Sequence, residues 1–139
     1  MTFLDTNVIV YAIDAQDRQK HAIAASLMDS ALGGGDEFRI SAQVLFEFAN
    51  ICLKKLGCDA QEVLKMLDLL RCITIVDQTP PLVGRAVEIK ALYGISLQDA
   101  MIVAAAEKAG CAELLSEDLN DGQSYAGVRV RNPFKAGFP

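Results

Sequence analysis

Short apolar runs alternate with longer helical patterns along the chain, and this alternation restricts the fold more than any other feature of the sequence. Apolar runs of this length between turn residues are typical of buried strands. Strands that are separated by helices pair in parallel through right-handed crossovers. We therefore predict a three-layer α/β fold with a central, mainly parallel sheet and helices on both faces. The predicted strands are Met1–Asp5, Phe38–Ser41, Cys72–Val76, Glu113–Ser116 and Val128–Val130.

Capping residues mark the ends of the helices between these strands. Thr6 or Asn7 is the expected cap of the first helix. Asp59 and Glu62 have the spacing of a capping box, and Gly94 is placed to end a helix. The predicted helices cover residues 7–13, 17–32, 42–56, 59–70, 80–93 and 96–109. The chain shows no repeat and no linker, so we expect a single domain over residues 1–139.

Composition excludes several classes of protein. The chain has 18 acidic and 13 basic residues, which argues against a nucleic-acid binder that relies on a general basic surface. It does not exclude one whose acids surround a cation, because a bound cation reverses the local charge. The four cysteines have no C-x-x-C spacing and His21 is the only histidine, so we expect reduced thiols and no zinc site. Since no stretch of 18 residues is wholly apolar, we expect a cytoplasmic protein with no membrane span.

The segment FLDTN at residues 3–7 ends an apolar run in a carboxylate. A buried carboxylate is costly unless it gains a partner, a proton or a metal ion. Asp5 stands at the carboxyl end of the first predicted strand, and open α/β sheets bind their ligands outside the carboxyl ends of their strands. Asp5 is therefore the first candidate residue of a functional site.

Other acids could join Asp5 there. Asp118 and Asp121 follow the fourth strand in LLSEDLNDGQ, Asp99 lies on the apolar face of its helix, and Glu47 lies at the margin of another apolar stripe. Each also has a simpler explanation: Asp99 could close a capping box with Ser96, Glu47 could lie on a solvated edge, and the loop acids could be turn formers. Clustered carboxylates without His or Cys suit Mg²⁺ or Mn²⁺.

Five segments occur together in an order that is similar to PIN-domain proteins, and especially to VapC-type toxins of bacterial toxin–antitoxin pairs. They are FLDTNVIVYA, SAQVLFEFAN, LQDAMIVAAA, LLSED and VRVRNPF. This resemblance covers nearly the whole chain. It implies a ribonuclease that uses one or two divalent cations, a cognate antitoxin as partner, and a homodimer.

The resemblance also implies the site residues. The family's acids match Asp5, Glu47, Asp99 and Asp118, which would bind Mg²⁺ or Mn²⁺. The polar residues Thr6, Asn7 and Ser116 match supporting positions of the family, and their hydroxyl or amide groups would orient the carboxylates. Asp121 has no firm counterpart and is kept as a candidate outer ligand.

The cation would activate a water for in-line attack on a phosphodiester. This chemistry needs no 2′-hydroxyl, so RNA as substrate is implied by the resemblance and not by the residues. Two further functions remain open, namely housekeeping RNA processing and a catalytically weak scaffold that binds a partner. A phosphatase of the haloacid-dehalogenase type is disfavoured, because such sites use a second Asp where this chain has Asn7.

Overall fold

The computed structural model describes residues 1–138; residue 139, the last of the expected domain, lies outside them. Six strands form one sheet in the order β3-β2-β1-β4-β6-β5, and every pair except β5–β6 is parallel. The predicted mainly parallel α/β fold is therefore confirmed. The strands are β1 Thr2–Leu4, β2 Phe38–Ser41, β3 Thr74–Val76, β4 Glu113–Leu115, β5 Ser124–Tyr125 and β6 Val128–Arg131.

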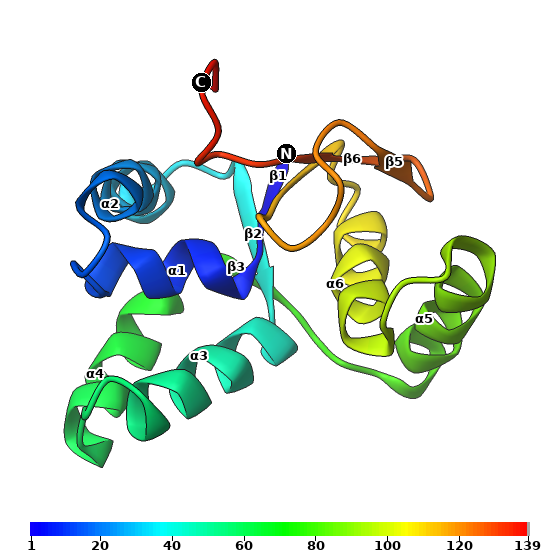
Figure 1. Ribbon diagram of the computed structural model, residues 1–139. Helices are drawn as coiled ribbons and strands as arrows, with labels where there is room; N and C mark the ends of the chain where they lie inside the picture. The colour runs from blue at the N-terminus through cyan, green and yellow to red at the C-terminus, as the bar shows by residue number, and fades with distance from the viewer. Residues whose placement is uncertain (139) are drawn as a thin grey trace.

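Helices cover the sheet from two sides. The first four contact one another on one side (Figure 1). On the other side α6 packs against β2, β4 and β6, and α5 packs on α6. Their bounds are α1 Thr6–Ile13, α2 Arg18–Leu32, α3 Ala42–Lys54, α4 Ala60–Leu70, α5 Pro80–Tyr93 and α6 Leu97–Lys108. No single helix among residues 1–138 has the length and apolar composition to cross a membrane. Only α5 and α6 taken together have that length and composition, and this pair is bent by 115°.

The short strand β1 lies inside the sheet and sets the position of the site. Phe3 and Leu4 are fully buried, and β1 pairs in parallel with β2 on one side and β4 on the other. Leu4 is in register with Leu115, and the Asp5 N–H donates to the Leu115 carbonyl at 3.0 Å. The residues that follow β1 and β4 therefore meet at the carboxyl edge of the sheet.

Most predicted caps are present, and one was assigned to the wrong residue. Asp59 and Glu62 form the expected capping box, and Gly94 ends α5 in the left-handed conformation with φ of 69°. The first helix, however, is capped by Asp5 and not by Thr6 or Asn7, because the Asp5 side chain accepts a hydrogen bond from the Thr6 N–H. The candidate site residue Asp5 is therefore also the N-cap of α1.

A two-residue hairpin at the edge of the sheet was not predicted. Tyr125 pairs with Val128, and the intervening Ala126 and Gly127 have φ of 51° and 83°. Positive φ at both central residues is the geometry of a type I′ turn, whose usual residues are Asn and Gly. Because β5 has only two residues and Ala126 is not a turn former, the sequence pattern gave no signal for this strand.

Ala126→Asn should stabilise the protein by about 1 kcal/mol, because Asn adopts the left-handed conformation more readily than Ala. Urea unfolding followed by circular dichroism measures the change. Ala112→Asn is the control, because Ala112 is exposed and lies outside the left-handed region. Equal effects at the two positions would show that the turn carries no strain.

Candidate acidic site at the ends of β1 and β4

Asp5 is a buried carboxylate, with 5% of its surface exposed. Its Oδ1 accepts a hydrogen bond from the Thr6 N–H at 2.7 Å, and its Oδ2 accepts one from the Ser116 hydroxyl at 2.6 Å. The Asn7 amide lies 3.4 Å from the same Oδ2. All three donors are neutral, and no base among residues 1–138 forms an ion pair with Asp5. The carboxylate is oriented by these bonds but its charge is not compensated.

Ser116 connects the end of β1 to the loop after β4. It is fully buried, and its Oγ donates to Asp5 while accepting from the Asp118 N–H at 3.1 Å. The Asn7 Nδ2 lies 3.5 Å from the same Oγ and donates to Asp118 Oδ2 at 3.1 Å. Ser116 and Asn7 therefore link Asp5 and Asp118 through hydrogen bonds.

Helices α3 and α6 bring two further acids. The Thr6 hydroxyl donates to Glu47 Oε1 at 3.2 Å, which fixes the α3 acid relative to the start of α1. Asp99 lies in the first turn of α6, where its N–H donates to the Ser96 hydroxyl at 3.1 Å. Ser96 thus supplies one half of the predicted capping box. Because this bond uses the Asp99 backbone, the cap and a site role for the carboxylate are compatible.

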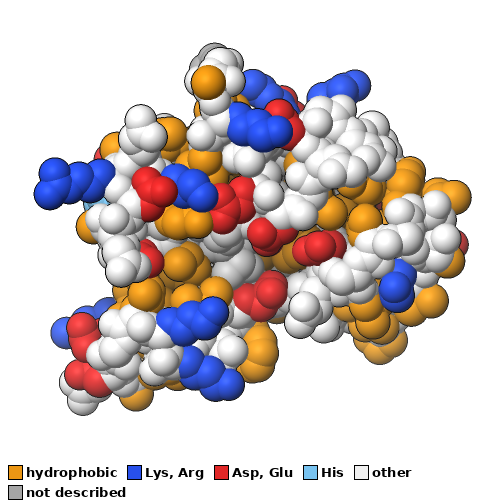
Figure 2. All heavy atoms as spheres, in the orientation of Figure 1, with side chains coloured by type: hydrophobic (Ala, Val, Ile, Leu, Met, Phe, Trp, Pro, Cys, Tyr) orange, Lys and Arg blue, Asp and Glu red, His pale blue; other side chains and the backbone are white. Residues whose placement is uncertain are grey.

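A cavity of about 580 Å³ holds this set of acids. Its lining includes the residues Asp5, Thr6, Asn7, Glu47, Asp99 and Asp118. Figure 2 shows carboxylates gathered around the middle of this face, in the hollow between the α1–α4 half and the α5–α6 half. The four acids that lie on four different segments of the sequence are therefore neighbours at one edge of the sheet.

Asp121 does not line this cavity. Its Oδ1 accepts from the Asn132 N–H at 2.8 Å, and its Oδ2 lies 3.9 Å from the Lys135 Nζ. These contacts tie the loop after β4 to the C-terminal segment. The structure thus brings together every predicted site residue except Asp121.

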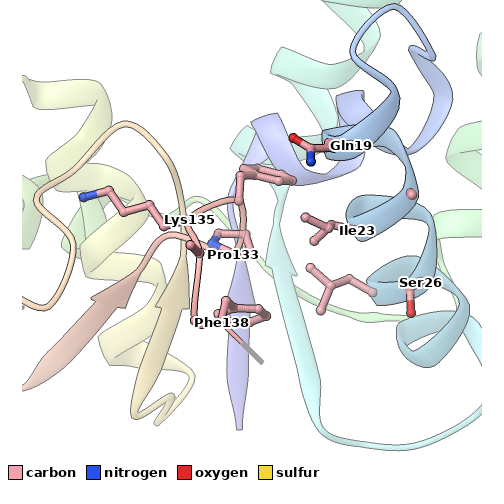
Figure 3. Close-up of a pocket in the computed structure, with 11 residues that line it drawn as sticks. Gln19, Ile23, Ser26, Pro133, Lys135 and Phe138 are labelled. Atoms are coloured by element: carbon pink, nitrogen blue, oxygen red, sulfur yellow. The ribbon is translucent and has the colours of Figure 1, made fainter.

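A second cavity, of about 730 Å³, lies between α2 and the C-terminal segment (Figure 3). Ile23 and Phe138 lie on its two sides, and Gln19, Ser26 and Lys135 add polar groups. None of the four acids lines this second cavity. Although it is larger than the acidic cavity, it is therefore not the candidate active site.

Burial and mutual repulsion disfavour the charged forms of these acids. Burial raises the pKa of Asp5 to about 7, the nearby Asp118 and Glu47 add to the rise, and the hydrogen bonds from Ser116 and Thr6 oppose it. Burial also raises the pKa of Glu47 and that of Asp99, with smaller contributions from neighbouring acids. An acidic set of this kind is stabilised by a cation and destabilised without one.

The residues fit a hard divalent cation. Carboxylate, hydroxyl and amide oxygens are the ligands that Mg²⁺ and Mn²⁺ prefer. Asn7 adds a buried Oδ1 that has no hydrogen-bond partner among the described residues. Within residues 1–138, no three acidic side chains converge into a preformed cage. The set therefore suits a cation that keeps several waters and takes one or two carboxylates, as Mg²⁺ does.

Three residues near the acids were not predicted as part of the site, namely Tyr11, Lys20 and Glu117. The structure places Tyr11 and Glu117 on the wall of the acidic cavity, and Lys20 forms an ion pair with Glu117 at 2.8 Å. Tyr11 follows Asn7 by four residues, and this helical spacing was the available signal.

Comparisons with known proteins identify the fold. VapC20 from Mycobacterium tuberculosis, a toxin that cleaves the sarcin-ricin loop, matches with a TM-score of 0.68 and 21% identity, over 93% of this chain and 99% of that one. A toxin–antitoxin complex from Klebsiella pneumoniae matches with a TM-score of 0.69 and 20% identity, over 96% and 98%. VapBC2 from Rickettsia felis, bound to a promoter DNA fragment, matches with a TM-score of 0.66 and 18% identity, over 94% and 97%.

No curated protein matches the chain by sequence. The PIN domain family, in contrast, matches residues 2–121. This match includes the four acids and the strands β1 to β4 but neither β5 nor β6. The chain belongs to the PIN domain family.

Proposed function

We propose that the protein is a divalent-metal-dependent endoribonuclease and the toxin of a VapBC-like toxin–antitoxin pair. The observation that carries this proposal is the acidic cavity, where the buried and uncompensated Asp5 shares one site with Glu47, Asp99 and Asp118. The family supplies the nuclease class, and the VapC structures with the same fold support the toxin class. In this proposal residues 1–139 act as one domain in the cytoplasm.

Each residue has a proposed role in holding a cation and the substrate. Asp5, Asp99 and Asp118 hold Mg²⁺ or Mn²⁺ directly or through water, and Glu47 completes the set or orients the attacking water. A bound divalent cation lowers the pKa of water and offsets charge on the phosphate during in-line displacement.

Three neutral residues position these acids. Thr6 orients Glu47 through its hydroxyl. Ser116 and Asn7 orient Asp5 and Asp118. Such outer hydrogen bonds fix the rotamers of ligands and tune their basicity.

RNA is the proposed substrate because VapC20, which shares the fold, is a toxin that cleaves the sarcin-ricin loop. A cognate antitoxin is the proposed partner because two of the related structures are VapBC complexes and a third is a toxin–antitoxin complex. The antitoxin would present an Arg or Lys to the carboxylates in place of the cation, since charge-assisted hydrogen bonds are strong there. A homodimer is also proposed, and exposed apolar side chains such as Phe46 and Leu92 are available to form it.

The purified protein, freed of its partner, should cleave single-stranded RNA only with Mg²⁺ or Mn²⁺. Asp118→Asn should lower the cleavage rate by at least roughly 100-fold, because it removes a charged ligand. Asp121→Asn is the matched control and should retain nearly full activity, because Asp121 lies outside the cavity. Labelled RNA incubated with and without EDTA gives the measurement.

Equal cleavage in EDTA and in Mg²⁺ would refute the metal mechanism. Metal binding without any cleavage of total RNA would favour the catalytically weak scaffold. Cleavage of a cellular RNA precursor to its mature end, in the absence of an antitoxin, would favour housekeeping RNA processing.

A further inference from the structure

Glu117 is an acid beside the proposed cation site whose two oxygens are both engaged elsewhere. Its Oε1 accepts from the Tyr11 hydroxyl at 2.8 Å, and its Oε2 accepts from the Lys20 Nζ at 2.8 Å. The Lys20 Nζ also lies 3.3 Å from the Tyr11 hydroxyl, so the three side chains form a closed network. Asp118, the next residue, is exposed, and its carboxylate accepts a hydrogen bond from the neutral Asn7 amide.

Both partners of Glu117 are held by helices. The Lys20 N–H donates to the Asp17 side chain that caps α2, and the Lys20 Nζ lies 4.9 Å from the centre of the Tyr11 ring. The Tyr11 ring meets Phe134 edge to face, with 5.0 Å between the ring centres. The α1 carbonyl of Tyr11 lies 2.8 Å from the His21 Nδ1. The network therefore rests on α1, α2 and the C-terminal segment together.

Asp118 lies on the same loop after β4 and directly follows Glu117. Its N–H donates to Ser116 and its Oδ2 accepts from Asn7. A loop residue whose carboxylate must meet a cation needs its backbone fixed, because ligand geometry tolerates only small displacements. Glu117 lies between the buried Ser116 and the exposed Asp118, at the point where such an anchor acts.

We propose that Lys20 and Tyr11 are positioning residues that act through Glu117: they anchor the loop after β4 so that Asp118 faces the cation site, and they keep the Glu117 carboxylate out of it. This inference rests on the proposed function, since it concerns the same cation site. It also separates the two acids of the LLSED segment, because Asp118 is available to a cation and Glu117 is committed to Lys20 and Tyr11.

A second ion pair provides a matched control. Arg85 donates to both carboxylate oxygens of Glu107 at 2.8 and 2.9 Å. The two side chains are 38% and 33% exposed, against 33% and 21% for Lys20 and Glu117. Glu107 lies eight residues after Asp99 on α6, roughly 12 Å along the helix at 1.5 Å per residue. Partly exposed ion pairs contribute little to stability, so neither pair should contribute much to the free energy of unfolding.

The double variant Lys20→Met/Glu117→Gln tests the proposal without changing the net charge. Titration of the metal-free protein with Mn²⁺ should show a Kd that is about tenfold higher than that of wild type, the size expected when an orienting partner of a metal ligand is lost. Tyr11→Phe removes one hydroxyl and should raise the Kd by a smaller factor. Arg85→Met/Glu107→Gln should leave the Kd unchanged.

Hydrogen exchange on the metal-free protein gives a readout that needs no cation. The Asp118 N–H should exchange faster in Lys20→Met/Glu117→Gln than in wild type, and at the wild-type rate in the Arg85/Glu107 variant. A wild-type Kd and a wild-type exchange rate in the Lys20/Glu117 variant would overturn the proposal, as would equal weakening of Mn²⁺ binding in both variants. If wild type binds no Mn²⁺, the proposed function fails, while the exchange rate still decides whether the network holds Asp118.

Discussion

Asp5→Asn should abolish RNA cleavage and leave the metal-free protein at least as stable as wild type at pH 7 and above. The reason is the cost of the buried charge. Burial raises the pKa of Asp5 from 3.8 to about 7, and at about 1.4 kcal/mol per pKa unit the ionised side chain destabilises the fold by on the order of 4 kcal/mol. An amide in its place loses one hydrogen bond, from Thr6 or Ser116, which costs about 1 kcal/mol.

The sign of the pH dependence follows from proton binding. Between about pH 4 and pH 7 the folded wild type keeps the Asp5 proton while the unfolded chain has released it. Stability falls with rising pH wherever the folded state binds more protons, so the free energy of unfolding should fall across this window. Asp5→Asn removes this part of the slope, and its advantage over wild type should grow from pH 4 to pH 7.

Urea unfolding of the metal-free proteins from pH 4 to pH 8 measures this effect. Adding Mg²⁺ or Mn²⁺ should stabilise wild type more than Asp5→Asn, because a ligand that binds only the folded state stabilises through its affinity. Asp121→Asn is the control for charge removal at an exposed position outside the acidic cavity. A free energy of unfolding of metal-free Asp5→Asn clearly below that of wild type at pH 8 would mean that Asp5 is a structural acid.

Ser116→Ala should weaken both the fold and the metal site, because one hydroxyl serves both Asp5 and the Asp118 backbone. Its loss leaves buried polar groups without a partner and should lower the free energy of unfolding by about 1–3 kcal/mol. The affinity for Mn²⁺ should fall by roughly 10- to 100-fold, the range found for orienting partners of metal ligands.

A pH profile separates these two consequences of Ser116→Ala. The Ser116 hydroxyl lowers the pKa of Asp5, so its loss should move the onset of Mn²⁺ binding to higher pH. Ser30→Ala removes an exposed hydroxyl that bonds the Ser26 carbonyl and should leave the affinity and its pH profile unchanged. Unchanged Mn²⁺ binding by a folded Ser116→Ala protein would show that Ser116 does not orient the site.

The core of the fold could be predicted because local patterns and tertiary packing agree there. The β1 run is apolar since it lies inside a parallel sheet, and the Asp59–Glu62 capping box formed as its spacing predicted. The hairpin at Ala126 could not be predicted, because its pairing depends on the neighbouring β6 and not on its own two residues. Short strands at a sheet edge carry too little pattern to be recognised.

The candidate site could be predicted only through its acids. Asp5 and Asp118 could be identified from the sequence because each follows an apolar run. Glu47 and Asp99 have no such local signal, and only the resemblance to PIN-domain proteins assigned them to the same site. The ion pair of Lys20 with Glu117 joins residues that are 97 positions apart. No local spacing encodes such a contact, so only the folded arrangement of α2 beside the loop after β4 could identify it.

The position of Asp5 at the start of α1 restricts how a protein with this fold could lose the proposed activity during evolution. The same side chain caps the helix and lines the cavity. Replacing a capping Asp with Ala costs about 1 kcal/mol, whereas Asn, Ser and Thr keep the cap. Lineages that have abandoned catalysis but kept the fold should therefore carry Asn, Ser or Thr at this position, and Ala should be rare among them. Sequencing of inactive descendants would reveal this bias.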